Sequence, residues 1–163
     1  MDEKDILWNM YQEHCTHGRH TETLRATTTN ILLAVAAGTI AVITHGDNSI
    51  ALKNLPLAIL LVLVGLLGAI FSAKYHERFA MHTERARKYR DALEKLVPAS
   101  DIRLLKTQAD EISEKKYPRL FHLRLYKFWI TLHFLVAVLG LVLAVLIIVL
   151  NWQQVISVFH FAS

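Results

Sequence analysis

The side chains with the richest potential chemistry near the start of the chain lie in the sequence Glu-His-Cys-Thr-His-Gly-Arg-His. They are His14, Cys15, His17 and His20. On a helix His14 and His17 share one face with Gly18, and His20 points elsewhere. Two imidazoles at this spacing can ligate zinc, but a structural zinc site needs four ligands. We therefore expect a polar, pH-sensitive helix face here rather than a metal site.

The rest of the sequence offers no arrangement that is typical of an enzyme active site. It contains no glycine-rich phosphate-binding loop, and it suggests no paired carboxylates in a membrane cavity and no Ser-His-acid pattern. Cys15 could act as a nucleophile beside His14 or His17, but nothing in the sequence positions an oxyanion hole. We expect no catalytic residue, no metal and no cofactor, and a function other than catalysis.

A second distinctive segment is strongly basic and lies in the middle of the chain. Residues 74–127 hold fourteen of the 18 Lys and Arg together with eight acids, whereas residues 1–26 hold three bases and five acids. Such a surface can bind anionic lipid headgroups or a polyanionic ligand such as a nucleotide, and charge alone leaves both open. The candidate ligand-binding residues are Arg78, Arg85, Arg87, Lys88 and Arg90. For each of them the alternative is a solvated or lipid-facing charge.

Hydropathy indicates that membrane-spanning helices must position these segments. Hydrophobic residues make up 53% of the 163 residues and charged residues only 20%. The longest stretches without Asp, Glu, Lys or Arg are Ala26–Gly46, Asn54–Ala73 and Phe128–Ser163. Each is at least as long as the ~20 residues that a helix needs to cross a bilayer. This distribution excludes a soluble enzyme with a conventional core and a disordered chain.

Charge asymmetry predicts the orientation of three spans. Seventeen of the 18 Lys and Arg then lie on one side of the membrane and Lys53 alone lies on the other. The positive-inside rule places the amino terminus and the basic segment in the cytoplasm. The expected organisation is a cytoplasmic amphipathic helix (1–26), a transmembrane hairpin (27–73), a cytoplasmic helical segment (74–127), a third transmembrane helix (128–150) and an external tail (151–163).

The periodicity predicts an all-α membrane protein with a cytoplasmic helical bundle. The first helix covers roughly Lys4–Arg25 and is weakened by Gly18, and span two continues past Ala73 as one helix of about 40 residues. Its second half carries a heptad seam of Phe79, His82, Ala86, Tyr89, Leu93 and Leu96. A heptad seam predicts a helical partner. A further helix, between Pro98 and Pro118, carries a stripe of Ile102, Leu105, Ala109 and Ile112.

Turn-forming and capping residues mark the ends of these helices. Gly46, Asp47, Asn48 and Ser49 form a cluster of turn residues between the first two spans. Pro56 suits the first turn of span two, where its missing N–H costs little. Ser100 can cap the next helix, with Asp101 near its positive end.

Small residues on each span predict close helix packing, because lipid tails provide no hydrophobic force between helices. The stripes are Asn30, Ala34, Ala37, Gly38 and Ala41 in span one, Gly65, Gly68, Ala69 and Ser72 in span two, and Ala137, Gly140 and Ala144 in span three. The three helices of one chain could satisfy these stripes between themselves, or the stripes could join subunits of an oligomer.

Few polar groups lie within the spans, and His133 is the only ionisable one. It lies near the interface rather than at the midplane, where a transporter or proton pump normally carries acids or bases. The sequence therefore disfavours a transporter. A water-filled pore could still form by oligomerisation, lined by the Thr and Asn face of span one.

The basic stretch Tyr75–Leu93 resembles the SLATT family of bacterial membrane effectors. That family has an amino-terminal helix, a closely spaced transmembrane pair and a cytoplasmic helix with a pattern of the type His-x3-Ala-x2-Tyr-x2-Leu. The matching positions here are His82, Ala86, Tyr89 and, one residue late, Leu93. The resemblance covers about residues 5–97, and the third span departs from the two-span pattern of the family.

The resemblance implies a function. SLATT proteins look like pore-forming effectors of bacterial antiphage systems, linked to partners that make or sense nucleotide signals. It implies a homo-oligomer in the bacterial inner membrane that opens in abortive infection, with a nucleotidyltransferase as partner and a nucleotide or oligonucleotide as ligand. Two alternatives stay open. One is a non-conducting oligomeric membrane scaffold that recruits a soluble partner or anionic lipid, and the other is a subunit of a larger transporter.

Overall fold

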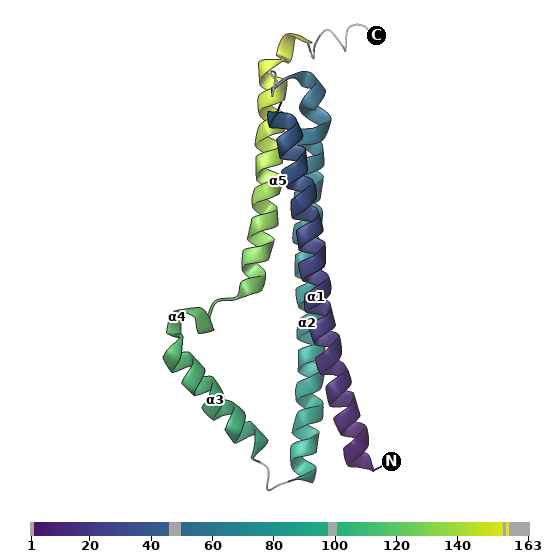
Figure 1. Ribbon diagram of the computed structural model, residues 1–163, viewed down its shortest axis with the longest axis vertical. Helices are drawn as coiled ribbons and strands as arrows, with labels where there is room; N and C mark the ends of the chain where they lie inside the picture. The colour runs from purple at the N-terminus through teal and green to yellow at the C-terminus, as the bar shows by residue number, and fades with distance from the viewer. Residues whose placement is uncertain (1, 46–49, 98–100, 155, 157–163) are drawn as a thin grey trace. The chain divides into compact units, whose positions relative to one another are not determined.

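A computed structural model describes residues 2–45, 50–97, 101–154 and 156, and within these residues the chain is helical without a strand. Figure 1 shows the elements in their order along the chain. They are α1 (Glu3–Thr44), the 3-10 helix η1 (Leu52–Asn54), α2 (Leu55–Leu96), α3 (Ile102–Lys116), α4 (Pro118–Phe121) and α5 (Leu125–Leu150). The predicted all-α class is confirmed. The turn formers at residues 46–49, the breaker Pro98, the cap Ser100 and most of the expected tail lie outside the described residues.

Three helices are long and apolar enough to cross a membrane, as the sequence predicts. Both α1 and α2 contain 42 residues. At a rise of 1.5 Å per residue each is about 63 Å long, roughly twice the hydrocarbon thickness of a bilayer. A large part of each therefore extends beyond any membrane that it spans. The helix α5, with 26 residues, is close to the length of a single span and begins three residues before the predicted Phe128.

The helix α1 is continuous where the sequence suggested an amphipathic helix followed by a separate span. Nothing between Glu3 and Thr44 breaks it, because the segment contains no proline and Gly18 lies well inside the helix. Threonine hydroxyls donate to carbonyls one turn earlier, as in the 2.8 Å bond from Thr39 to the Val35 oxygen. This bond satisfies a polar side chain inside an apolar helix.

The prediction that span two continues as one long helix is confirmed by α2. Pro56 is its second residue, where the missing N–H has no intrahelical acceptor in any case. No proline or glycine follows Gly68 in the helix. The helix therefore carries the heptad seam without interruption.

The chain forms two compact units. The first, called here the polar unit, comprises Met1–Leu24 and Lys74–Leu125. The second, called the apolar unit, comprises Arg25–Ala73 and Tyr126–Ser163.

In the apolar unit α1, α2 and α5 share a narrow core. One buried cluster contains Ala36, Ile43, Leu61 and Val64, and a second contains Ala58, Ala144 and Ile147. Glycines bring α2 and α5 to backbone contact. A Cβ at Gly65 would lie 2.7 Å from the Ala137 Cα, and a Cβ at Gly140 would lie 2.7 Å from the Val62 nitrogen. Real Cβ atoms do not approach so closely, so these positions require glycine.

In the polar unit the heptad seam of α2 packs against the first half of α1. Ala86 and Leu93 are buried, and Phe79, His82 and Tyr89 are half-buried. The Leu96 side chain at the end of the seam remains exposed. The partner that the seam predicts is thus the amino-terminal helix of the same chain.

The helix α3 is joined to α2 by polar contacts. The Arg103 guanidinium lies 3.2 Å from Asp91 and 3.7 Å from Glu94, and the Arg103 N–H donates to Glu94 at 3.0 Å. Its predicted apolar stripe does not form a bundle core within the chain, because no residue of α3 is buried. Leu105 and Ile112 are 62% and 66% exposed.

Candidate functional site

Three histidines meet where α1 and α2 pair in the polar unit. The Nδ1 atoms of His14 and His82 are 3.1 Å apart, and the His17 ring stacks on His82 with centroids 5.2 Å apart. The His14 ring also stacks on Tyr89 at 5.5 Å. One ring of the His14–His82 pair must donate and the other accept, so at least one of them is neutral. His20, as expected, is exposed and takes no part.

The surroundings of His82 favour its neutral form. Burial is the main cause that lowers its pKa below the ordinary value of about 6.5, and the neighbouring charges of His14, His17, Arg85 and Arg78 lower the pKa further. A neutral His82 can complete the hydrogen bond with His14. Among the described residues no group of three or more His, Cys, Asp or Glu side chains could hold a metal ion.

A cavity of about 400 Å³ adjoins this histidine cluster. Its lining contains Tyr11, His14, Cys15, Gly18, Phe79, Thr83 and Ala86, together with the bases Arg19, Arg87, Arg90 and Lys106. No carboxylate is among these lining residues. The cavity is thus a concave surface with aromatic walls and four cationic groups, contributed by α1, α2 and α3.

Acidic side chains next to the cavity partly balance these cations. Arg90 lies 2.8 Å from Asp91, and its hydrogen bond is the main cause that lowers the pKa of that carboxyl group. Arg87 lies 3.5 Å from Glu84, and the two side chains are more than half exposed. Lys106 pairs with Asp110 one turn along α3.

Hydrogen bonds also involve other lining residues of the cavity. A hydrogen bond with Cys15 is the main cause that raises the pKa of Tyr11, and burial adds to it, while Arg90 acts in the opposite direction. The Arg19 guanidinium makes a 3.3 Å hydrogen bond to the Thr16 hydroxyl. Tyr11 therefore presents a neutral ring to the cavity at physiological pH.

The cavity separates the five predicted ligand residues into two groups. Arg87 and Arg90 line it, whereas Arg78, Arg85 and Lys88 do not. The charges of Arg78 and Arg85 instead help to lower the pKa of His82. Lys88 lies 4.0 Å from Glu84, and 76% of its side chain is exposed.

Sequence reasoning missed Arg19 and Lys106, because they come from α1 and α3 rather than from the basic stretch of α2. No local spacing signals their convergence, since only the pairing of the helices brings them together. The residues on which the family resemblance was based, His82, Ala86, Tyr89 and Leu93, lie on the face of α2 that contacts α1. Only Ala86 of these four lines the cavity.

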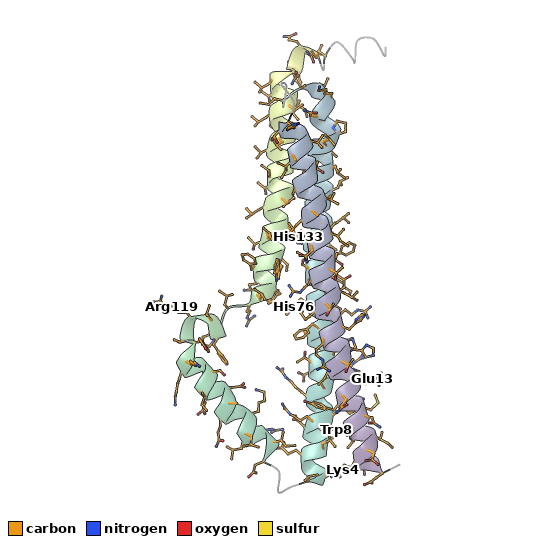
Figure 2. All side chains as sticks on the ribbon, viewed as in Figure 1. Lys4, Trp8, Glu13, His76, Arg119 and His133 are labelled. Atoms are coloured by element: carbon orange, nitrogen blue, oxygen red, sulfur yellow. The ribbon has the colours of Figure 1, made fainter. Side chains whose placement is uncertain are left out.

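In the apolar unit the three most deeply buried polar side chains come one from each helix. They are Thr29 of α1, Ser72 of α2 and His133 of α5, each no more than 2% exposed. His133 projects from α5 toward its neighbours (Figure 2), and its Nε2 lies 3.5 Å from the Thr29 hydroxyl. A Cβ on Gly68 would lie 2.5 Å from Cγ of the His133 ring, so this glycine makes room for the imidazole. The one ionisable residue predicted within the spans is thus buried between helices.

The small-residue stripes of the three spans have different surroundings. Gly65, Gly68 and Gly140 are buried between α2 and α5. Asn30, Ala34 and Gly38 lie on the face of α1 that points away from the core residues, and all three are exposed. A Cβ on Gly38 would meet nothing within 4 Å. Two of the three stripes are therefore satisfied within the chain, and that of α1 is not.

Searches against protein-family models, curated proteins and solved structures find no match to this chain.

Proposed function

We propose that this protein is an oligomeric, pore-forming membrane effector. The observation that carries the proposal is the exposed face of α1, where Asn30, Ala34 and Gly38 point away from the core of their own chain. In lipid, helices associate where small residues permit close approach and where polar side chains bond across the contact. A second copy of the same chain supplies both.

In a membrane the side-chain amide of Asn30 makes the isolated monomer less favourable than an oligomer. A side-chain amide facing hydrocarbon loses its hydrogen bonds to water, at a cost of roughly 2–7 kcal/mol depending on the reference state. Association through α1 allows Asn30 side chains of neighbouring subunits to bond to one another. In a ring with this face toward the axis, Thr27 and Asn30 place polar side chains at one end of the path, and Ala34 and Gly38 leave room along it.

Charge asymmetry supports the orientation of this assembly. With the amino terminus and residues 74–127 in the cytoplasm, the polar unit meets cytosolic signals. In the full proposal the protein is a SLATT-like effector of the bacterial inner membrane. A nucleotide or oligonucleotide made by a partner nucleotidyltransferase binds its basic helices during phage infection. That ligand changes pore opening by binding one state more tightly than the other.

The test is the membrane potential of bacteria that express the protein under an inducible promoter together with its signal. The wild type is expected to depolarise the cells, as a potential-sensitive dye reports. Gly38→Leu places a bulky side chain on the α1 face and is expected to abolish both oligomer and depolarisation. Val35→Leu, also exposed on α1 but to the side of the Asn30, Ala34 and Gly38 series, is the matched control and is expected to behave as wild type. An unchanged potential with the wild type contradicts the proposal.

The exposed apolar stripe of α3 supports a second candidate, a non-conducting scaffold. Leu105 and Ile112 are exposed on a helix that also carries Arg103, Lys115 and Lys116. Its four bases and three acids leave a net charge of +1, and the exposed apolar stripe beside them suits a lipid surface or a protein partner. Ion flux from liposomes containing the purified protein separates the two functions, because a scaffold assembles without conducting.

A further inference from the structure

Gly18 has no packing reason to be glycine. Glycine weakens the interior of a helix, and at Gly65, Gly68 and Gly140 close contact explains it. At Gly18 a Cβ would lie 3.8 Å from the Phe79 ring, which is ordinary van der Waals contact. What the missing side chain leaves open is the cavity, because Gly18 is one of its lining residues.

The lining of this cavity combines flat rings with cations. Tyr11 and Phe79 offer aromatic surfaces, and Arg19, Arg87 and Lys106 offer donors for phosphate oxygens. The carboxylates that neighbour the cations, such as Glu84 and Asp110, are not lining residues. Exposed ion pairs of this kind are weak, so a phosphate can compete for the cationic partners.

We propose that the cavity binds a single nucleotide, with its base against Phe79 and Tyr11 and its phosphates among Arg19, Arg87 and Lys106. The volume of about 400 Å³ falls in the range of small-molecule sites, roughly 300–1,000 Å³. It favours one nucleotide over an oligonucleotide strand. The regulatory meaning of the site rests on the proposed function, whereas the binding itself does not.

Such a ligand bridges three helices of the polar unit. Arg19 belongs to α1, Arg87 to α2 and Lys106 to α3. A nucleotide that contacts all three binds the converged arrangement better than any arrangement in which one helix has moved away. The differential contacts that a ligand-controlled change requires are therefore present.

The experiment measures binding of a fluorescent ATP analogue to the purified full-length protein in detergent or nanodiscs. Gly18→Leu fills the cavity without changing the charge and is expected to weaken binding at least tenfold. Arg19→Gln is expected to weaken it similarly. Lys88→Gln removes one cation outside the cavity and is expected to leave the affinity within twofold at the same ionic strength. Inorganic pyrophosphate is expected to compete poorly, because it lacks the base.

Several results would overturn the proposal. Equal effects of Lys88→Gln and Arg19→Gln would show that general surface charge binds the probe. Full affinity in Gly18→Leu would place the probe elsewhere. Equal competition by pyrophosphate would show that the base contributes nothing to binding. Stronger competition by an oligonucleotide or by anionic lipid vesicles would show that the surface binds that ligand instead of a single nucleotide. Circular dichroism and size-exclusion chromatography verify folding, and Phe79→Ala, also expected to lose at least tenfold, replaces Gly18→Leu if that variant does not fold.

The outcome is separable from that of the proposed function. Binding of the ATP analogue by a protein that never depolarises cells would sustain the site and refute the pore. Depolarisation by a protein that binds no nucleotide would sustain the pore and refute the site.

Discussion

The helix contacts of the two units differ in what fills the space between the backbones. In the apolar unit α2 and α5 touch through Gly65 and Gly140, where no Cβ fits. In the polar unit α1 and α2 are separated by the rings of His14, His82 and Phe79, and a cavity of about 400 Å³ remains beside them. Gly18 borders that cavity, and a Cβ there would clash with nothing.

The proposed membrane location of the apolar unit accounts for this difference. Helices in lipid gain nothing from burying apolar side chains, so close backbone packing must supply the attraction. Helices in water gain from burying rings, and polar ring atoms can still find partners. Glycine therefore serves contact in the first case and space in the second. Substitutions that add or remove side-chain volume distinguish the two uses.

Gly65→Ala is expected to have the largest effect. The added methyl would meet the backbone of Ala137, which cannot rotate away. Overpacking costs typically ~1–3 kcal/mol and occasionally more. The gain in helix propensity is about 1 kcal/mol. Because the neighbouring atoms are backbone, the cost lies above that typical range, and the expected net loss of about 3 kcal/mol or more is measurable by thermal unfolding in detergent. Gly38→Ala is the control and is expected to be neutral or stabilising, since nothing lies near its Cβ.

His133→Ala is expected to cost about 2–3 kcal/mol in the same measurement, by analogy with other large-to-small substitutions in cores. Thr29→Val is expected to cost under about 1 kcal/mol, because the 3.5 Å contact between the two side chains is long for a hydrogen bond. The comparison tests whether packing contributes more than the polar contact to the stability of the apolar unit. An equal or larger cost for Thr29→Val would assign the stability to the polar contact instead.

Asn30→Leu is expected to weaken self-association without weakening the fold of the single chain. Interhelical hydrogen bonds in membranes contribute roughly 0.6–2 kcal/mol, so the dissociation constant should rise by about three- to thirty-fold. Cross-linking in nanodiscs of defined composition measures the change. The control Ile31→Leu alters the neighbouring exposed position and should leave assembly intact. An Asn30→Leu protein that assembles like the wild type would exclude this face as the interface.

Acidification is expected to loosen the α1–α2 contact of the polar unit. This is the smallest of the expected effects. Because the pKa of His82 is lowered in the folded protein, the separated helices bind more protons than the packed ones as the pH falls below about 6.5. The packed state is therefore fully stable above that pH and loses stability below it. Hydrogen exchange of peptides around residues 10–20 and 78–90 should increase between about pH 7.5 and 5.5.

The variant His82→Phe should reduce this pH dependence while retaining an aromatic side chain in the contact. The His14 and His17 side chains face the same ring. His20→Gln is the control, since its side chain is exposed. An unchanged pH response in His82→Phe would assign the titration to another group.

Much of the fold could be predicted because membranes impose strong local rules. Long apolar runs without charges predict the three spans, and the absence of any breaker after Ala73 predicts the uninterrupted helix α2. The seam from Phe79 to Leu93 predicts a helical partner. The polar composition before Arg25 suggested a separate first helix, but backbone hydrogen bonding continues across such a change where no proline intervenes.

The candidate site could be predicted only in part. The basic stretch of α2 indicated Arg87 and Arg90, but it could not distinguish them from Lys88, because neighbouring residues on a helix point in different directions. Arg19 and Lys106 lie 68 and 16 residues in sequence from Arg87 and Arg90. Only the pairing of α1, α2 and α3 brings such distant residues to one cavity.

The sequence by itself determined that this protein is helical, that three of its helices can cross a membrane and that its bases gather between the second and third. Those properties depend on the composition of short stretches, because each stretch favours lipid or water according to its own residues. The tertiary structure decided which glycine faces are covered, that His14 meets His82, and that α1 leaves Asn30 and Gly38 uncovered. These outcomes depend on the register and rotation of one helix against another, which arise from contacts between residues far apart in the chain.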